Sequence, residues 1–285
     1  MSGWLGQAFV FNNRAGLSYG FVQERGGPCG VLAAVQAVLL KVLLHGSQTF
    51  SLRPRPMKSL EQGLALQERS AALAAAMAEV LIRCAGNQQE RKEVEYKVVL
   101  AGMRKHFSSA GRLRADGLTE TLNIHSFTSP AALRDFLQQN IGFMTGRGNS
   151  GVVCFFYSCL LTRGLNTVRA DMDSPDSHLM AAHGYCSQEM VNLITTGVAA
   201  SNVFDNQVVL GSDTEQTVLK GVTRQSEVGL LSLFEHYKSC SVGSNLKSPL
   251  YPVWLVCSES HFTTLWAGQA GDTNQLYYYD GLAGN

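Results

Sequence analysis

The strongest candidate for a reactive side chain in this sequence is Cys29, which directly follows the turn-forming residues Gly26, Gly27 and Pro28. Such a turn cannot continue a helix from upstream, and the apolar residues after Cys29 recur at helical spacing as far as Leu44. The pattern predicts a helix that begins at Cys29. The first turn of a helix has unpaired backbone N–H groups that favour an anion, so a cysteine there tends toward the nucleophilic thiolate.

A second residue, Gln23, strengthens this interpretation. Its side-chain amide lies a few residues before Cys29, where it can donate to a developing oxyanion beside the backbone N–H of the cysteine. The plainer alternative is that Cys29 is only a small buried residue at the start of a core helix. The chain has seven cysteines, but only Cys29 combines the Gly-Gly-Pro turn, a helix start and an upstream amide.

A cysteine nucleophile needs a general base, which is usually a histidine from a distant part of the chain. Among seven histidines, we favour His261 because it opens a predicted strand and can project from a sheet edge toward the helix start. Asp280 ends the next predicted strand, where its carboxylate can fix the tautomer of the imidazole. Alternatively, Asp280 and Gly281 only form a turn, so we rank Asp280 below the other three residues. We expect the remaining histidines to be surface, core or substrate-adjacent residues: His45, His106, His125, His178, His183 and His236.

Helices in the first two thirds of the chain and strands near its end are expected to position these side chains. Helices are predicted at 29–45, 59–85, 130–141, 187–196 and 227–237. Strands are predicted at 7–11, 17–22, 119–127, 251–257, 261–266 and 275–279, with a hairpin formed by 207–210 and 216–219. Two segments stay open between helix and strand, 93–100 and 152–161. The result is an α+β fold of papain-like kind, with a buried central helix that carries the nucleophile and a C-terminal antiparallel sheet.

Composition narrows the possible functions. Hydrophobic residues make up 45% of the 285 residues, charged residues 16%, and the net charge is +1. Without a basic stripe we expect no nucleic-acid partner, and the longest apolar run, 152–161, is too short to span a membrane. The N-terminus lacks the pattern of a secretory signal. An odd number of scattered cysteines indicates reduced thiols in a cytoplasmic or nuclear protein, and no zinc-ligand spacing is present.

Several motifs give this chain a resemblance to the MINDY family of deubiquitinating cysteine proteases. The resemblance begins with Gln23, the turn 26–29 and the helix after it. It continues through three further groups: Ser177-His178-Leu179 with 182–186, the segment 231–237, and 257–262 with 277–282. It covers nearly all of residues 1–285, which we therefore treat as a single catalytic domain.

The resemblance implies a thiol hydrolase that cuts isopeptide bonds in polyubiquitin, with lysine-48-linked chains preferred. It implies a helix at 152–161, ubiquitin as partner, and no metal or organic cofactor. The catalytic positions would be Cys29, His261 and Gln23, with Asp280 as a weaker candidate. The alternatives are a polyubiquitin-binding pseudoenzyme and a cysteine hydrolase for another peptide or a ubiquitin-like tag.

The resemblance has two departures. The chain stops at Gly284-Asn285, where family members continue, and the loop 267–274 is shorter than expected. We therefore expect either a C-terminal truncation or a divergent paralogue, and both would affect the completeness of the sheet edge.

Overall fold

The computed structural model describes residues 2–86, 94–103, 115–212, 215–268 and 275–284. The helices are α1 (Ser2–Leu5), α2 (Cys29–His45), α3 (Met57–Glu61), α4 (Leu66–Ala85), α5 (Pro130–Gln139), α6 (Ile141–Thr145), α7 (Gly151–Arg163), α8 (Leu165–Asp171), α9 (Gln188–Thr196), α10 (Leu233–His236) and α11 (Ser244–Lys247). The strands are β1 (Tyr96–Ala101), β2 (Leu122–Phe127), β3 (Gln207–Ser212), β4 (Glu215–Lys220), β5 (Gly229–Ser232), β6 (Val253–Ser258), β7 (His261–Ala267) and β8 (Leu276–Tyr279).

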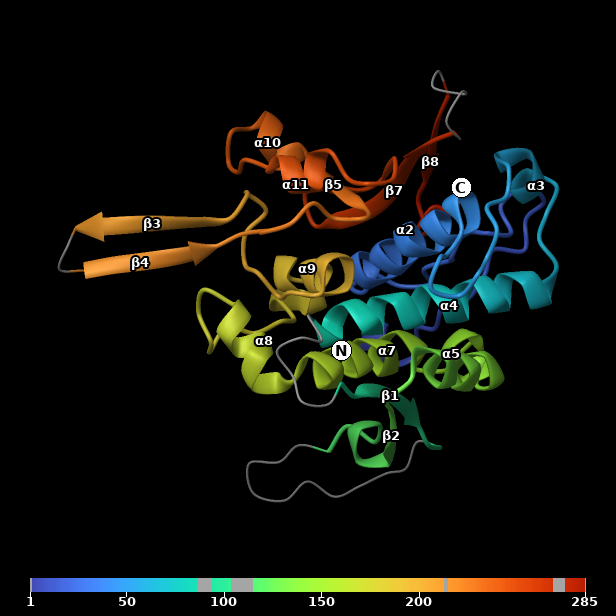
Figure 1. Cartoon of the computed structure of the whole chain (residues 1–285). Coiled ribbons are helices and arrows are strands. Elements are labelled where there is room, and N and C mark those ends of the chain that lie inside the picture. Colours follow the sequence, from blue (N-terminus) through green and yellow to red (C-terminus); the bar gives the residue numbers. More distant parts are fainter. Residues whose placement is uncertain (1, 87–93, 104–114, 213–214, 269–274, 285) are drawn as a thin grey trace.

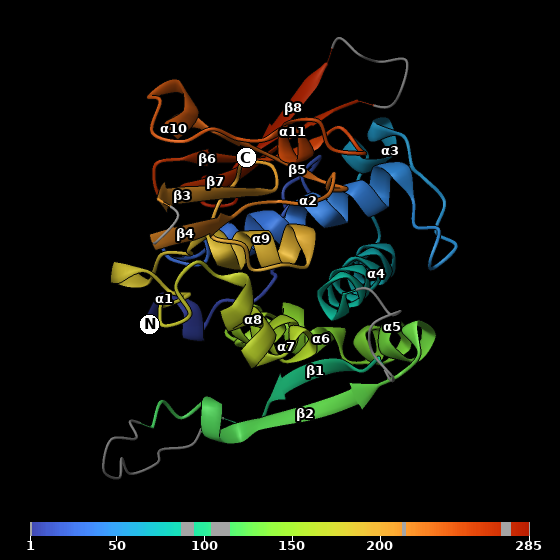
Figure 2. The same cartoon turned by 60° about the vertical axis from the view of Figure 1, so that its left-hand side comes forward.

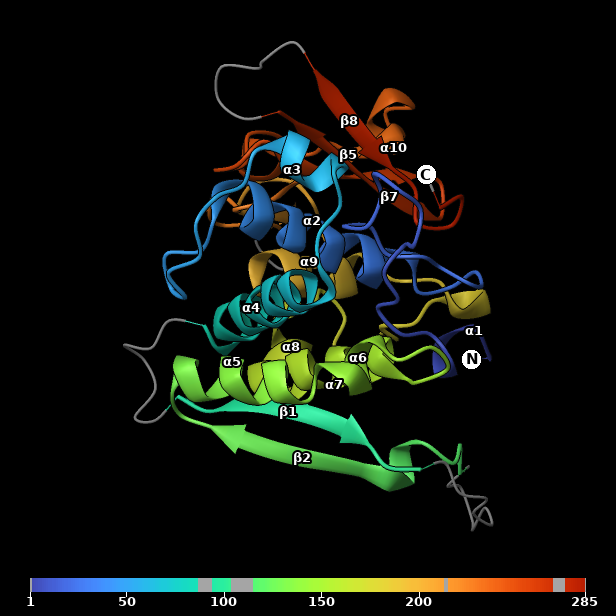
Figure 3. The same cartoon turned by 90° about the vertical axis from the view of Figure 1, so that its right-hand side faces the viewer.

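These elements form a stack of layers (Figure 3). A four-stranded sheet, β5–β6–β7–β8, lies at one end. Beneath it come α2, then α4 and α9, then α7 with α5, and finally the two-stranded sheet β1–β2. Apolar faces therefore meet at every layer boundary, which is how helices and sheets bury their hydrophobic sides.

Helix α2 lies between the large sheet and the other helices. It packs against β6 and β7 on one side and against α4 and α9 on the other. Every residue from Cys29 to Leu44 is buried. A helix that is apolar nearly all round can be stable only in such surroundings, so the sequence pattern of α2 and its place in the fold agree.

The large sheet brings the end of the chain against α2. Strands β6, β7 and β8 are antiparallel neighbours, and β5 pairs with β6 in parallel. The sheet is therefore mixed, whereas the sequence predicted only antiparallel pairing. In the register of β6 and β7, Ser258 lies opposite His261, so only Glu259 and Ser260 form the turn between them.

A buried charge cluster joins three of the layers. Lys41 of α2 donates to Glu79 of α4 at 2.9 Å, and its ammonium lies 3.5 Å from the carboxylate of Glu227, just before β5. Arg83 of α4 also pairs with Glu227. Burial alone would raise the pKa of Glu227, but Arg83 and Lys41 lower it overall. Removing one member would leave a buried charge without its partner, which is strongly destabilising.

Several predicted helices are confirmed, together with their start and stop signals. The hydroxyl of Ser129 accepts from the backbone N–H of Ala132 at the start of α5, and Ser187 caps α9 in the same way. Gly197 ends α9 in the left-handed conformation that glycine adopts easily. The segment 152–161 is helical within α7, as the family resemblance implied, whereas 96–101 is a strand.

Three other predictions were wrong or only partly right. The segments 7–11 and 17–22 pair only around one bridge, Phe11 with Phe21. The ladder does not extend further because the N–H groups of Phe9 and Phe21 donate to Met144 and Gln36 instead. The helix expected at 59–85 is broken at Gly63, whose φ is +99°. The segment 227–237 is mostly the strand β5 followed by the short helix α10, because β6 offers a pairing edge to the apolar residues before Ser232.

Within the described residues, no single helix is both long and apolar enough to cross a membrane. Helices α7 and α8 meet that criterion only when taken together across an 85° bend.

Candidate active site

Cys29 is the first residue of α2, directly after Pro28 at the cap position. Its side chain is 4% exposed. The thiol lies 3.5 Å from the carbonyl oxygen of Ser260 and 4.0 Å from that of Gly27. Because Ser260 directly precedes His261, the sulfur of Cys29 rests against the backbone at the start of β7. The fold thus brings together two predicted site residues that are more than two hundred positions apart.

His261 and Asp280 form a pair, as the sequence hypothesis required. The ring nitrogen Nε2 of His261 lies 2.9 Å from Oδ1 of Asp280. In the neutral ring, Nε2 then carries the proton donated to Asp280, which leaves Nδ1 with the lone pair of a base. Both side chains are partly exposed, so substrate and water can reach them.

Asp280 also forms a turn, so its contacts are compatible with both interpretations of this residue. The same oxygen that faces His261 accepts from the backbone N–H groups of Leu282 at 2.9 Å and Ala283 at 3.4 Å. These contacts fix the position of the carboxylate relative to the ring.

Gln23 lies close to both halves of the site. Its backbone N–H donates to the carbonyl of Gly281 at 2.8 Å, which ties the segment before Cys29 to the residue after Asp280. Its side-chain Nε2 donates to the carbonyl of Arg25 at 2.7 Å. An amide nitrogen has two N–H donors, so one remains for another acceptor. Gln23, Cys29 and Gly281 line the same small recess beside Phe262.

The electrostatics of Cys29 differ from the expectation drawn from its helix position. Burial raises the pKa of the Cys29 thiol, and the charge of Asp280 raises it further. Backbone hydrogen bonds from Phe262 and Gly30 act in the opposite direction without reversing the shift. The helix start therefore does not by itself produce a thiolate here, because removal from water outweighs the donors around the sulfur.

The structure adds Cys186 to the surroundings of the nucleophile. Its sulfur lies 3.4 Å from the carbonyl of Gly27, the same oxygen that faces Cys29. Cys186 also packs on Gly30. A Cβ atom added at position 30 would lie 2.7 Å from the Cβ of Cys186, which is too close, so only glycine fits there. Trp4 holds this region from the other side by donating to the carbonyl of Gly184 at 2.6 Å. The sequence offers no local signal for these contacts, since they join segments far apart in the chain.

A groove of about 660 Å³ opens beside the nucleophile. One end contains Ser260 and Phe262, the residues on either side of His261, together with Cys257. Its apolar lining includes Tyr185, Cys186, Leu230 and Phe234, and the segment 202–204 also lines it. The groove is mostly apolar and is lined by several segments of the chain, so it offers a peptide apolar contacts.

The other histidines lie apart from the pair of His261 and Asp280. His45 packs against Tyr251, and His125 packs against Phe136. His178, His183 and His236 are exposed, and His183 has a positive φ of 63°. His106 and most of the loop 267–274 lie outside the described residues.

A cysteine at a helix start, a histidine–carboxylate pair and an amide donor are the groups that nucleophilic acyl transfer uses. The MINDY-3/4 conserved-domain model, which describes a deubiquitinating enzyme, matches residues 1–285. The chain belongs to this family.

Several curated relatives match nearly the whole of this chain. The chain is 45% identical to the probable ubiquitin carboxyl-terminal hydrolase MINDY-4 of Mus musculus, over 98% of this chain and 37% of that protein. It is 43% identical to MINDY-4 of Homo sapiens, over 98% of this chain and 37% of that protein. Ubiquitin carboxyl-terminal hydrolase MINDY-3 of Bos taurus is 34% identical over 92% of this chain and 59% of its own length. The chain thus spans little more than a third of the curated MINDY-4 relatives. No solved structure matches it.

Proposed function

We propose that this chain is a cysteine-dependent isopeptidase that cleaves ubiquitin from ubiquitin. The observation that carries the proposal is the contact of the Cys29 thiol with Ser260, which places the sulfur one residue from His261 and its partner Asp280. Membership of a deubiquitinating family supplies the substrate class. The arrangement of a nucleophile on a buried helix and a base on a facing sheet supports a papain-like mechanism.

The reaction follows from the roles of the three groups. Nδ1 of His261 takes the thiol proton, and the sulfur attacks the carbonyl carbon of the isopeptide bond between the ubiquitin C-terminus and a lysine amine. The free N–H of Gln23 and the backbone N–H of Cys29 stabilise the oxyanion. The imidazolium then protonates the departing amine, which leaves a thioester. Water, deprotonated by the same ring, hydrolyses the thioester and releases the ubiquitin carboxylate.

The acidity of Cys29 bears on how the proton moves. Since burial raises the pKa of the thiol, the sulfur is protonated in the free protein at neutral pH. We propose that the thiol transfers its proton to His261 only when substrate occupies the site, because catalytic hydrogen bonds often become short only in the substrate complex. No metal or organic cofactor enters this scheme.

The groove beside Cys29 would hold the extended C-terminal tail of the ubiquitin that is released as the acid. Its apolar walls and its position next to Ser260 support this assignment. We further propose a preference for lysine-48-linked chains and an intracellular location. The first is supported by the family resemblance, and the second by seven cysteines without disulfides among the described residues.

The test is incubation with ubiquitin that carries a thiol-reactive warhead at its C-terminus, followed by mass spectrometry of the adduct. We expect one adduct, on Cys29. Cleavage of tetra-ubiquitin of each linkage then measures the preference, and equal cleavage of all linkages would contradict the lysine-48 assignment.

The second candidate is a module that binds polyubiquitin without cleaving it. One observation favours it: the thiol faces a carbonyl oxygen and not the His261 ring, and only 4% of Cys29 is exposed. Ubiquitin binding together with an unreactive Cys29 would establish this alternative.

A further inference from the structure

The hairpin formed by β3 and β4 carries apolar side chains on both of its faces. Val209 and Val218 are cross-strand partners on one face, and Val208 and Leu210 lie on the other. All four are exposed, with Val209 at 56% and Leu210 at 49%. In Figure 1 the hairpin projects away from the layered body.

Nothing among the described residues covers this surface. The only extensive contact of β3 and β4 is with each other. An isolated two-stranded hairpin is marginal in water, and exposed aliphatic side chains that lie side by side, as Val209 and Val218 do on one face, usually mark an interaction site. The four exposed aliphatic residues therefore favour a binding role over a structural one.

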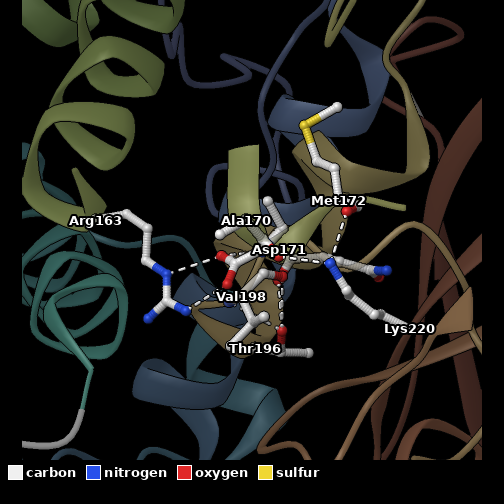
Figure 4. Close-up of polar contacts among 9 residues, drawn as sticks. Arg163, Ala170, Asp171, Met172, Thr196, Val198 and Lys220 are labelled. Atoms are coloured by element: carbon white, nitrogen blue, oxygen red, sulfur yellow. Dashed lines mark hydrogen bonds and ion pairs between the residues drawn. The ribbon is translucent and has the colours of Figure 1, made fainter. Parts of the chain in front are cut away.

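The base of the hairpin is firmly held. The ammonium of Lys220, at the end of β4, donates to the carbonyl oxygens of Ala170 at 2.7 Å and Met172 at 3.0 Å, where α8 ends (Figure 4). Its backbone N–H donates to Asp173 at 2.7 Å. Arg163 fixes the same helix end through two hydrogen bonds to Asp171. The hairpin is thus presented in a defined direction from a rigid support.

The hairpin is continuous with the groove at the active site. Asn202, Val203 and Phe204 line that groove and lead directly into β3. The views in Figures 1 and 2 both place the hairpin on the side of the molecule where α2 begins. The segment that leads into the hairpin therefore forms part of the wall of the groove.

We propose that the β3–β4 hairpin is a docking element for the folded body of the ubiquitin whose tail lies in the groove. This inference rests on the proposed function. The tail is covalently continuous with the body, and an extended chain advances only about 3.3 Å per residue, so a tail of a few residues keeps the body near the mouth of the groove. The aliphatic side chains of one face of the hairpin would then be buried against an apolar patch of ubiquitin.

The test distinguishes contacts made by the folded body of ubiquitin from contacts made by its tail. One probe is full-length ubiquitin with a C-terminal warhead, and the other is a short peptide of the ubiquitin tail with the same warhead. The variants are Val209→Glu on one face and Leu210→Glu on the other. The matched control is Ile124→Glu, since Ile124 is 55% exposed on β2 at the far end of the stack. Labelling rates are measured for all four proteins with both probes.

We expect at least one hairpin variant to react about tenfold or more slowly with the ubiquitin probe, because a charge placed in an apolar contact loses its water. The same variant should react with the tail peptide at the rate of the unsubstituted protein. Ile124→Glu should match the unsubstituted protein with both probes.

Three results would overturn the inference. Unchanged rates with ubiquitin in both variants would remove the hairpin from substrate docking, and equal losses with both probes would show a distorted site instead. A change of oligomeric state without a change in labelling would assign the hairpin to self-association. A failure of the unsubstituted protein to react with the ubiquitin probe is distinguishable from all three, because it contradicts the proposed function itself.

Discussion

The two halves of the candidate active site are held by different kinds of structure. Cys29 and Gln23 stand on either side of a short turn, and their positions depend on contacts within a few residues, such as the hydrogen bond from Gln23 to Arg25. His261 opens β7 and Asp280 directly follows β8, so the register of these two strands decides whether the residues meet. The comparison shows that one half is specified locally, whereas the other exists only when a whole sheet has formed.

The two halves also differ in their exposure to solvent. Cys29 is 4% exposed, whereas the side chain of His261 is 30% exposed. The reactive atom is therefore the one withdrawn from water, and the base is the group that water can reach. The substitutions below test whether the halves act as one unit, from the largest expected effect to the smallest.

Removing the nucleophile should have the largest effect. Cys29→Ala is expected to abolish cleavage of di-ubiquitin, since no other group can form the thioester. Ubiquitin binding should be largely kept because it does not depend on the sulfur. Activity is measured by gel and affinity by fluorescence polarisation with labelled ubiquitin. Cleavage that persists in this variant would move the nucleophile to another residue. Cys186 is one candidate, because its sulfur faces the same carbonyl oxygen of Gly27.

Removing the base should be nearly as damaging. His261→Ala is expected to lower single-turnover cleavage by a factor of about a thousand or more, because the buried thiol then has no proton acceptor. The matched control is His236→Ala, which changes an exposed histidine of α10 and should leave the rate unchanged. If the His236 variant is the slower one, the assignment of the base is wrong.

Substitutions of Gln23 test whether its side-chain amide stabilises the oxyanion. Gln23→Ala should slow the chemical step by about a hundred- to a thousandfold, the usual loss for one oxyanion donor. Gln23→Glu should be at least as slow, since a carboxylate repels the developing charge. Substrate binding should change little, because the contact forms mainly in the transition state.

A purely structural role for Gln23 predicts a different pattern. Both variants would then melt at a lower temperature, and their activity would fall in proportion to unfolding. Melting temperature and single-turnover rate are measured on the same samples, and a normal rate in stable Gln23→Ala protein would remove Gln23 from the site.

Asp280→Asn should have a smaller effect than His261→Ala. An amide oxygen can still accept from Nε2 of the imidazole, and cysteine–histidine pairs operate with asparagine in this place. The Asp280→Asn rate is compared with that of Asp280→Ala, which removes the acceptor altogether. Complete loss in a folded Asp280→Asn protein would show that the carboxylate charge is essential.

The smallest expected effect is on the acidity of Cys29. Burial is the main reason that its pKa is raised, and the negative charge of Asp280 adds to this. Asp280→Asn removes that charge, so the thiolate becomes easier to form and the pKa should fall. We expect the midpoint of the pH profile for alkylation of Cys29 to move to lower pH, as mapped by mass spectrometry. An unchanged or higher midpoint would show that the two halves are not electrostatically coupled.

The sequence by itself determined the local features of this protein. The start of α2 at Cys29, its end at His45 and the caps of α5 and α9 depend on residues only a few positions apart. The strand that opens with His261 and the turn at Asp280 were predictable for the same reason. Glycine, proline, serine and apolar periodicity act over this short range, so their effects can be recognised in the sequence without knowledge of the tertiary structure.

The tertiary structure alone decided which distant segments are in contact and how far each is buried from solvent. It paired β5 with β6 in parallel, brought Cys186 against Gly30, and joined Lys41 to Glu79 and Glu227. It also reversed the expected acidity of Cys29, because the cost of removing a charge from water depends on everything packed around the sulfur. No local pattern contains that information, since burial is a property of the assembled layers.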